Sequence, residues 1–315
     1  MLTNKEDKKM NARDYLEILH VAEKLKDTPR HSTTTKGRTE SVAEHSWRIS
    51  LMALLLRHEF PELDIDKVVS MCLIHDLGEC FTGDIPTFLK TDGDRKTEDE
   101  LLDQWVKSLP EGLSADLSGL YEEMNAQKTP ESKLYKALDK LEALIQHNEA
   151  PLYTWSDNEY ELNKTYAYNT VKFSDWLKAL REEILKDTLD KIDEACYLSE
   201  FCDVFYVEDK NVVLVHWKKY CELEQYRKPL ECALNVIREH VGCNYVADTR
   251  DGFEDNPLDT KWVADYFMPK AKEYGCQIIY FIIDKDNSLK DELEGQEKDS
   301  SSLLKFKYIY GLGEI

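Results

Sequence analysis

The sequence has no long hydrophobic run, and this absence excludes a membrane-spanning helix by length. No stretch approaching 18 uncharged apolar residues occurs among its 315 residues. The first residues, 1–7 (MLTNKED), contain no apolar core of the kind that a secretory signal peptide needs. We therefore expect a soluble protein that makes no membrane contact and is not exported.

Basic residues are too few to balance the acidic ones, and cysteine pairs with zinc-binding or redox spacing are absent. Lys and Arg total 41 against 62 Asp and Glu, a formal net charge of −21 that repels long nucleic acids. A small anionic substrate stays compatible with this charge, because one arginine or a metal ion reverses the local field. The eight cysteines are scattered without a CxxC pair, which is typical of reduced thiols in a cytoplasmic protein.

The chain does contain enough apolar residues to fold. A hydrophobic content of 42% and 33 aromatic residues argue against general disorder. The length suits two domains, and the pattern changes from helical to mixed near residues 194–202. We predict a multi-domain protein: an all-α helical bundle over residues 1–194, followed by a small α/β domain over residues 195–315.

Helix signals dominate the first half. Ser41 and Glu44 form a capping box that begins a helix with apolar residues every three or four positions. Thr129 followed by Pro130 predicts the start of another helix. Further helices are expected at 65–77, 95–108, 113–126 and 158–193, with a loop between Gly83 and Gly93.

The second half alternates strands with helices. Strands are expected at 203–207, 212–217, 244–247, 278–283 and 306–310, and helices at about 222–240 and 259–274. A charged, serine-containing stretch spans 284–302. This alternation predicts a small α/β sandwich.

Four side chains of the helical half form a candidate metal site. His45, His75, Asp76 and Asp139 provide two imidazoles and two carboxylates, a mixed set suited to Mn, Fe, Co, Ni or Zn. His45 and Asp76 fall at core-facing positions, where a charged Asp is costly unless it is paired or bound to metal. Three helices can therefore converge on one ion. Taken singly, each residue also has an ordinary explanation, such as a hydrogen-bonded core histidine or, for Asp139, an exposed helix face.

Four segments around these residues resemble the HD-domain metal-dependent phosphohydrolases, and more closely the HD-type 5′-deoxynucleotidases. Residues 38–46 (RTESVAEHS) resemble the segment with the first metal histidine, and residues 75–86 (HDLGECFTGDIP) resemble the central motif. Residues 139–142 (DKLE) match the segment with the last ligand, and residues 25–30 (LKDTPR) match the phosphate-binding segment. The resemblance covers roughly residues 12–190.

The resemblance implies one divalent ion, Co, Mn, Mg or Zn, held by His45, His75, Asp76 and Asp139. The ion would activate a water for in-line attack on a nucleoside 5′-monophosphate. It also implies that Glu79 transfers a proton, that Asp84 orients the water or the sugar, and that Arg30 binds the phosphate. From the residues alone, Glu79 could instead be a surface charge and Asp84 a turn residue.

The sequence departs from the family beside Arg30. An aromatic residue that helps to exclude a 2′-hydroxyl is expected there, whereas this chain has His31, which could substitute by packing; the preference for deoxy sugars is therefore open. The stretch 150–175 is rich in aromatic residues. Core or dimer packing explains these better than stacking on a base.

The C-terminal half resembles the STAS or SpoIIAA-like domains, which implies a regulatory or protein-interaction module. The main hypothesis is a metal-dependent phosphomonoesterase acting on (deoxy)nucleoside 5′-monophosphates. The alternatives are an HD phosphohydrolase of another nucleotide or cyclic phosphodiester, and a nucleotide-responsive signalling protein with the helical half as sensor. A homodimer is compatible with the resemblance, as is a protein partner of the C-terminal domain.

Overall fold

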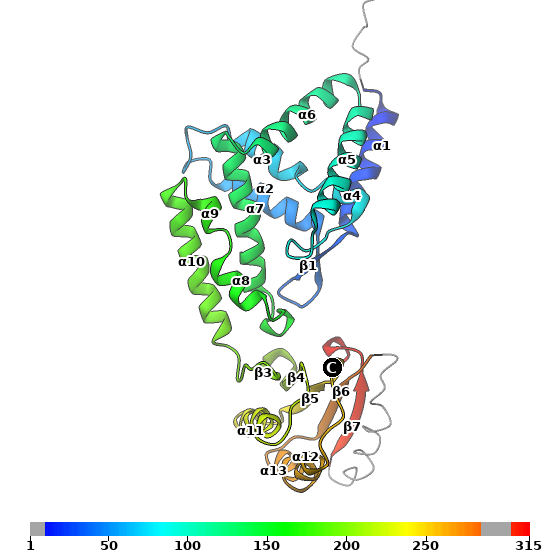
Figure 1. Ribbon diagram of the computed structural model, residues 1–315, viewed down its shortest axis with the longest axis vertical. Coiled ribbons are helices and arrows are strands. Elements are labelled where there is room, and N and C mark those ends of the chain that lie inside the picture. The colour runs from blue at the N-terminus through cyan, green and yellow to red at the C-terminus, as the bar shows by residue number, and fades with distance from the viewer. Residues whose placement is uncertain (1–9, 285–303) are drawn as a thin grey trace, which may run out of the picture. The chain divides into compact units, whose positions relative to one another are not determined.

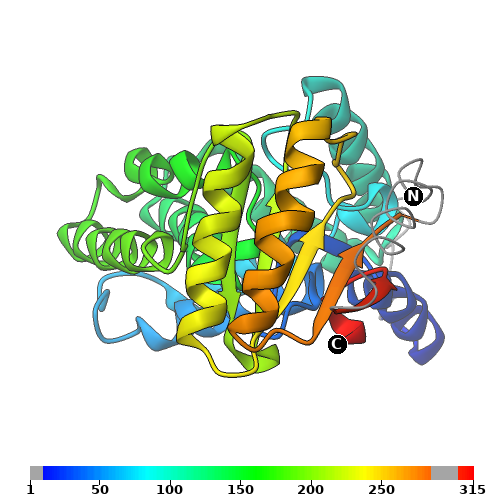
Figure 2. The ribbon, with the colours of Figure 1, turned by 90° about the horizontal axis from the view of Figure 1, so that it is seen from below.

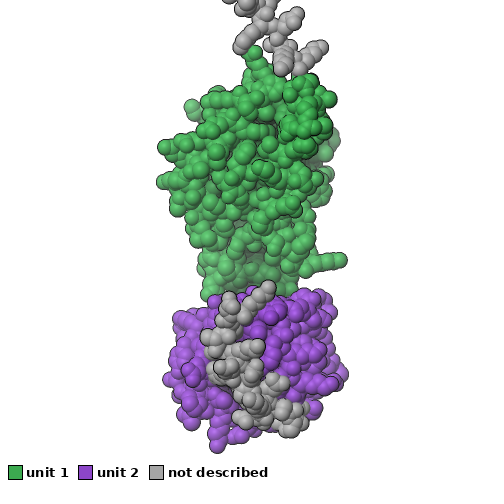
Figure 3. Space-filling view, turned by 90° about the vertical axis from the view of Figure 1, so that its right-hand side faces the viewer, with its two compact units in different colours: residues 1–189 green, residues 190–315 purple. Residues whose placement is uncertain are grey.

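The computed structural model describes residues 10–284 and 304–315, and the chain divides into two compact units, residues 1–189 and 190–315 (Figures 1 and 3). The first unit is helical apart from one short hairpin, and the second contains a mixed five-stranded sheet. These findings agree with the predicted order of an all-α part before an α/β part. The predicted charged stretch 284–302 lies outside the described residues except for Asp284.

The N-terminal unit is built around three packed helices, α2 (Val42–Leu55), α3 (Ile65–Ile74) and α7 (Pro130–Glu149). Their buried apolar residues, among them Ile49, Met71 and Leu138, form the core of the unit. The other helices of this unit surround the three: α1 (Ala12–Ala22), α4 (Glu79–Thr82), α5 (Asp92–Ser108), α6 (Glu111–Ala126), α8 (Glu159–Thr165), α9 (Tyr168–Val171) and α10 (Asp175–Ile192), with 3-10 turns at Glu23–Lys26 and Leu152–Thr154.

The predicted caps are confirmed. Ser41 accepts from the Glu44 backbone N–H, and the Glu44 carboxylate accepts from the Ser41 backbone N–H in return. Thr129 caps α7, and Pro130 occupies its first turn. Because these caps fix where α2 and α7 begin, they also fix the positions of His45 and Asp139 along the two helices.

A hairpin that the sequence pattern did not predict precedes α2. Strands β1 (Pro29–Thr33) and β2 (Thr39–Ser41) pair antiparallel, and Gly37 takes a positive φ of 74° in the connecting turn. The strands are short and mostly polar, so they lack the apolar alternation that marks a strand in sequence. The hairpin carries Arg30, His31 and Glu40 toward the bundle.

The predicted helix 65–77 is wrong at its C-terminal end. The regular helix α3 ends at Ile74, and residues 75–78 continue in tighter turns, with Leu77 N–H donating to the Ile74 carbonyl and Glu79 N–H to the Asp76 carbonyl. The His75 Nδ1 lies 2.9 Å from the Cys72 carbonyl, one of the groups left open at the helix end. Asp76 therefore reaches the site from a turn rather than from a helix face.

The predicted continuous helix 158–193 is also wrong. It is divided into α8, α9 and α10, and Ala167 takes a positive φ of 70° between the first two. The fully buried Arg181 of α10 donates to the carbonyls of Asn163 and Tyr166. This side chain satisfies the open carbonyls at the end of α8, a tertiary interaction that periodicity cannot reveal.

The C-terminal unit is a five-stranded sheet in the order β3-β4-β5-β6-β7. Strands β3 (Cys202–Val207) and β4 (Val212–Trp217) are antiparallel, and β5 (Asn244–Asp248), β6 (Ile278–Ile282) and β7 (Lys305–Ile309) follow in parallel. Helix α11 (Glu224–Glu239) lies beside the helical segment of α12 (Pro257–Trp262), a π-helical turn at Val263–Phe267 and α13 (Met268–Glu273), across one face of the sheet (Figure 2). Single 3-10 turns lie at Glu208–Lys210 and Leu312–Glu314. The strand predictions are confirmed to within a few residues.

Among the described residues, no helix is both long and apolar enough to cross a membrane.

Candidate active site

The four predicted metal ligands lie together inside the N-terminal unit. His45 comes from α2, His75 and Asp76 from the turn after α3, and Asp139 from α7. The Nε2 atom of His45 is 3.4 Å from Asp139 Oδ1 and 3.9 Å from Asp76 Oδ2. The Nε2 atom of His75 is 2.9 Å from Asp76 Oδ2 and 3.7 Å from Asp139 Oδ1. Two imidazole nitrogens and two carboxylates thus face one centre.

The protonation pattern of the two histidines fits a metal ion. His45 Nδ1 lies 2.5 Å from Glu142 Oε2, and His75 Nδ1 lies 2.9 Å from the Cys72 carbonyl, so each Nδ1 carries a proton directed away from the centre. Both Nε2 atoms are buried, and within the described residues neither makes a hydrogen bond, although carboxylate oxygens of Asp76 and Asp139 lie close to them. The donor atoms of His45, His75 and Asp76 lie within 4.8 Å of one another. Mixed nitrogen and oxygen donors of this kind suit a divalent transition metal.

The negative charge of Asp76 and Asp139 also favours a cation at this centre. Burial would lower the pKa of His75, but Asp76 and Asp139 outweigh it and raise the pKa to about 10. Burial would raise the pKa of Asp139, but Lys136, whose Nζ lies 2.7 Å away, and the two histidines hold it well below its usual value. The pocket therefore favours positive charge, which a divalent ion provides when bound.

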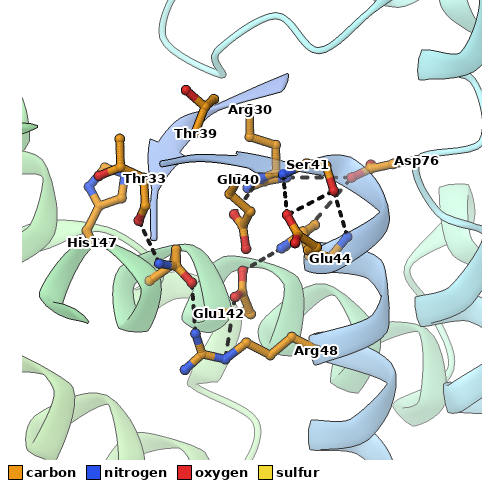
Figure 4. Close-up of polar contacts among 12 residues, drawn as sticks. Arg30, Thr33, Thr39, Glu40, Ser41, Glu44, Arg48, Asp76, Glu142 and His147 are labelled. Carbon is orange, nitrogen blue, oxygen red and sulfur yellow. Dashed lines mark hydrogen bonds and ion pairs between the residues drawn. The ribbon is translucent and has the colours of Figure 1, made fainter. Parts of the chain in front are cut away.

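Arg30 points at this centre from β1 (Figure 4). Its Nη1 lies 3.7 Å from Asp76 Oδ2, and its Nε lies 3.3 Å from Glu40 Oε2. Burial alone would lower the pKa of Arg30, but Asp76, Glu142, Glu40 and Asp84 together raise it. The guanidinium is thus a permanent positive charge at the edge of the metal centre, where it can accept an anionic group.

Two further buried carboxyl groups, Glu142 and Glu40, contact His45 and Arg30. The sequence pattern assigned neither of them a role. Glu142 touches His45 on one side, and its other oxygen lies 3.7 Å from Arg48 Nε (Figure 4). Glu40 is also buried, and burial together with the negative charge of Glu142 raises its pKa to about 7. The sequence did contain a signal, because Glu142 shares a helical seam with Asp139, and Glu40 lies within the segment that leads to His45.

Glu79 and Asp84 lie near the same centre. Glu79 begins α4, is 5% exposed, and has one carboxyl oxygen without a hydrogen-bond partner in the described part of the chain. Burial, assisted by the charges of Asp76 and Asp84, raises its pKa to about 10, so Glu79 is protonated at neutral pH. Asp84 lies in the following loop, and its charge raises the pKa of Arg30 and of His31. Glu79 is therefore not a surface charge, and Asp84 is close enough for its charge to act on the predicted substrate-binding residues.

His31 follows Arg30 on β1, and its Nε2 lies 3.1 Å from the buried carboxylate of Glu159. Its ring makes an edge contact with Phe88 at a centroid distance of 5.5 Å. In the aromatic stretch 150–175, Trp155 is buried and packs against His147 and Tyr160. For Trp155 this agrees with core packing.

A helical bundle in which two imidazoles and two carboxylates face one point, with an arginine and a buried glutamic acid beside them, has the donor set of a metal-dependent hydrolytic centre. Comparison with known proteins gives the family: the chain belongs to the HD-domain family, which matches residues 22–181. The predictions of an HD domain, of a hydrolase and of a divalent metal ion are confirmed at this level.

Several relatives are similar to the N-terminal part of the chain. The 5′-deoxynucleotidase HDDC2 of Bos taurus is 34% identical over 142 residues, which cover 44% of this chain and 68% of the relative. The human HDDC2 is 33% identical over 142 residues, covering 44% and 69%. The crystal structure of a "predicted metal-dependent phosphohydrolase" from Magnetospirillum magnetotacticum MS-1 aligns with a TM-score of 0.51 at 27% identity, covering 57% of this chain and 93% of that one.

Proposed function

We propose that this chain is a divalent-metal-dependent phosphomonoesterase that hydrolyses deoxynucleoside 5′-monophosphates to nucleoside and phosphate. One observation carries the proposal: the Arg30 guanidinium and the protonated Glu79 lie beside the His45, His75, Asp76 and Asp139 centre. The relatives named 5′-deoxynucleotidase support the nucleotide as substrate. The strongly acidic chain supports a small substrate rather than a long nucleic acid.

Each residue takes a role that its position permits. Arg30 binds non-bridging phosphate oxygens through its planar fork of donors, and Glu40 at 3.3 Å holds that fork in place. A divalent ion bound by the two histidines and two aspartates would screen the phosphate charge and lower the pKa of a water molecule. Asp84, whose charge acts on Arg30 and His31, orients the water or the sugar.

Glu79 is proposed as the general acid. The water oxygen forms a bond to phosphorus and the water gives up a proton to the solvent, while the bond from phosphorus to the 5′-oxygen breaks. The 5′-oxygen must take up a proton to leave as an alcohol. A carboxylic acid that keeps its proton at neutral pH can supply it. The buried position of Glu79 is what maintains the protonated form.

The test is phosphate release from a panel of deoxy- and ribonucleoside monophosphates. Metal-stripped protein is re-supplied with Co, Mn, Mg or Zn, and an Asp76→Ala variant serves as control. We expect release that needs metal and is lost in the variant, with deoxynucleotides as substrates. Absence of release from every monophosphate, despite stoichiometric metal binding, would refute the proposal.

For the C-terminal unit we propose a STAS-like module that contacts a protein partner. The mixed sheet, with one antiparallel hairpin followed by three parallel strands and helices between them, supports this assignment. The eight cysteines are all free thiols, which supports a reducing, cytoplasmic setting. A pull-down with the full chain, compared with a variant changed on the surface of this unit, would test for the partner.

We also propose a homodimer through α2. Trp47, Leu51, Leu54 and Leu55 are exposed and fall on one side of this helix. Light scattering on the full chain and on a Trp47→Glu variant tests this, with a dimer expected for the first and a monomer for the second. A monomeric parent protein would contradict it.

A further inference from the structure

A buried carboxylate lies between two histidines beside the proposed phosphate-binding arginine. Glu159, at the start of α8, is 2% exposed, and its Oε1 lies 3.1 Å from His31 Nε2 and 3.4 Å from His147 Nε2. Its Oε2 accepts from the Ser156 backbone N–H at 2.6 Å. A buried carboxylate is stable only with such partners, so this contact is a built feature of the fold rather than a chance surface pair.

The two histidines are not equivalent. His147 is largely enclosed, and burial, with help from the charges of His31 and Arg30, lowers its pKa. Asn163 Nδ2 lies 3.4 Å from its Nδ1, so neutral His147 carries its proton on Nε2, facing Glu159. His31 is 39% exposed, and the contact with Glu159 raises its pKa above the ordinary value despite partial burial. Of the two histidines, His31 is therefore the one that is more easily protonated.

His31 belongs to the same strand as Arg30. It is the next residue after Arg30, and Asp84 exerts its charge on both. Phe88 contacts one edge of the His31 ring. Because Nε2 faces Glu159, the other ring nitrogen, Nδ1, is left to donate to a ligand. Of the three residues in this cluster, His31 alone is accessible enough to touch a substrate.

Glu159 is also rigidly held. The buried Arg181 guanidinium donates to the Asn163 and Tyr166 carbonyls and lies over the Tyr168 ring at 4.5 Å. Helix α8 is thereby tied to α10. Glu159, the first residue of α8, is held at the other end of this helix by the hydrogen bond that it accepts from the Ser156 backbone N–H.

We infer that Glu159 is a positioning residue for substrate selection, which holds His31 so that its free ring nitrogen donates to a sugar oxygen of the bound nucleoside monophosphate. This inference rests on the proposed function and deepens it. It explains why a histidine can stand beside Arg30 where the family has an aromatic residue. The phosphate subsite at Arg30 and the metal ligands are separate from this contact.

The test compares Glu159→Gln and His31→Asn with Glu161→Gln, a matched control on the exposed side of the same helix. We expect KM for a deoxynucleoside monophosphate to rise roughly tenfold in the first two variants, as for a lost hydrogen bond to a charged donor, with kcat within about twofold. Inhibition by inorganic phosphate, which lacks the sugar, should be unchanged. The double variant should be no worse than either single one. An unchanged KM in His31→Asn, or equal weakening of phosphate inhibition, would overturn the inference.

A second readout separates this inference from the proposed function. The titration of the His31 ring followed by NMR should shift to lower pH in Glu159→Gln, without any turnover. If the parent protein hydrolysed no monophosphate, the proposed function would fail alone, and the binding constant of a deoxynucleoside monophosphate measured by calorimetry would replace KM. An unshifted His31 titration would contradict the positioning role in either case.

Discussion

The two units of this chain differ in whether their buried charged side chains are fully paired. In the C-terminal unit the buried Asp248 and Asp259 are paired with arginines at 2.6 and 2.7 Å, and Asp203 lies 3.0 Å from Lys218. In the N-terminal unit the buried Glu79 and Glu142 each keep an oxygen without a hydrogen-bond partner, as do His45 and His75 with a nitrogen. Within the described residues, the buried side-chain atoms that lack such partners all belong to the N-terminal unit.

This difference distinguishes a scaffold from a reactive centre. An unpaired buried polar group costs about 1–3 kcal/mol, so several in one place need a reason other than stability. In the N-terminal unit the unpartnered nitrogens of His45 and His75 face the carboxylates of Asp76 and Asp139, where a metal ion can satisfy them. In the described part of the C-terminal unit the buried carboxylates of Asp203, Asp248 and Asp259 are paired with basic side chains and stabilise the fold.

The largest expected effect is on catalysis. Changing Glu79→Gln removes the proposed acid but keeps the shape of the side chain, and kcat should fall by about 10²–10⁴-fold. Metal binding, measured by calorimetry, should stay near that of the parent protein. A variant with normal kcat would show that the unpaired carboxyl has no catalytic role.

Glu79→Gln should also have a higher free energy of unfolding than the parent protein, because burying the ionisable carboxyl of Glu79 destabilises the fold. The unfolded chain loses the Glu79 proton near its ordinary pKa of 4.5, whereas the folded protein keeps it to about pH 10. The unfolded state then binds fewer protons over this window, so the free energy of unfolding falls as pH rises. Metal-free Glu79→Gln should therefore melt at a higher temperature than the parent at pH 8, with a smaller gain at pH 5. Equal melting at pH 8 would contradict the burial cost.

Breaking a paired charge in the other unit should give the reverse result. Asp259 accepts from Arg227 Nε and from the Leu223 backbone N–H, both at 2.7 Å. Asp259→Asn should lower the free energy of unfolding of that unit by about 3 kcal/mol, because it leaves a partly buried guanidinium without its carboxylate. The kcat and KM for nucleotide should stay unchanged. The control Asp265→Asn, on an exposed part of the same segment, should unfold like the parent.

A smaller effect, on metal affinity, is expected at Glu142, which contacts the proposed metal ligand His45. Glu142→Gln weakens the acceptor that fixes the His45 proton, and metal affinity should fall about 10–100-fold. Competition with a chelator measures this directly. Glu149→Gln is the matched control, because Glu149 is on the same helix and binds the same Arg48 from its exposed side. If both variants bound metal alike, Glu142 would be a structural charge only.

The smallest effect is expected at the surface. Asp66 pairs with Arg57 in full contact with solvent, where screening leaves little net interaction. Asp66→Asn should change neither the melting temperature nor phosphate release measurably. A clear loss of either would mean that exposed pairs matter here as much as buried ones.

The sequence revealed the parts of this design that local chemistry encodes. The capping residues Ser41 and Thr129 fixed two helix starts. The resemblance of the surrounding segments to the HD-domain family pointed to His45, His75, Asp76 and Asp139, which the fold brings together. The strands of the second half were also recognisable from their apolar composition. Each of these signals lies within a few residues of the element it predicts.

The features that were missed depend on residues far apart in the chain. The break after α8 is satisfied by Arg181 of α10, and the hairpin that carries Arg30 is too short and polar to show alternation. Glu159 meets His31 and His147 only in the folded bundle. Helical periodicity contains no information on these tertiary contacts, so the role of Glu159 became visible only in three dimensions.

The most direct test of the central claim is to titrate Co²⁺ into metal-stripped full-length protein and follow bound metal and phosphate release from a deoxynucleoside monophosphate together. We predict that release rises in proportion to one bound ion per chain, and that Asp139→Ala loses both. Release without metal, or one bound ion with no release from any monophosphate, would contradict the account.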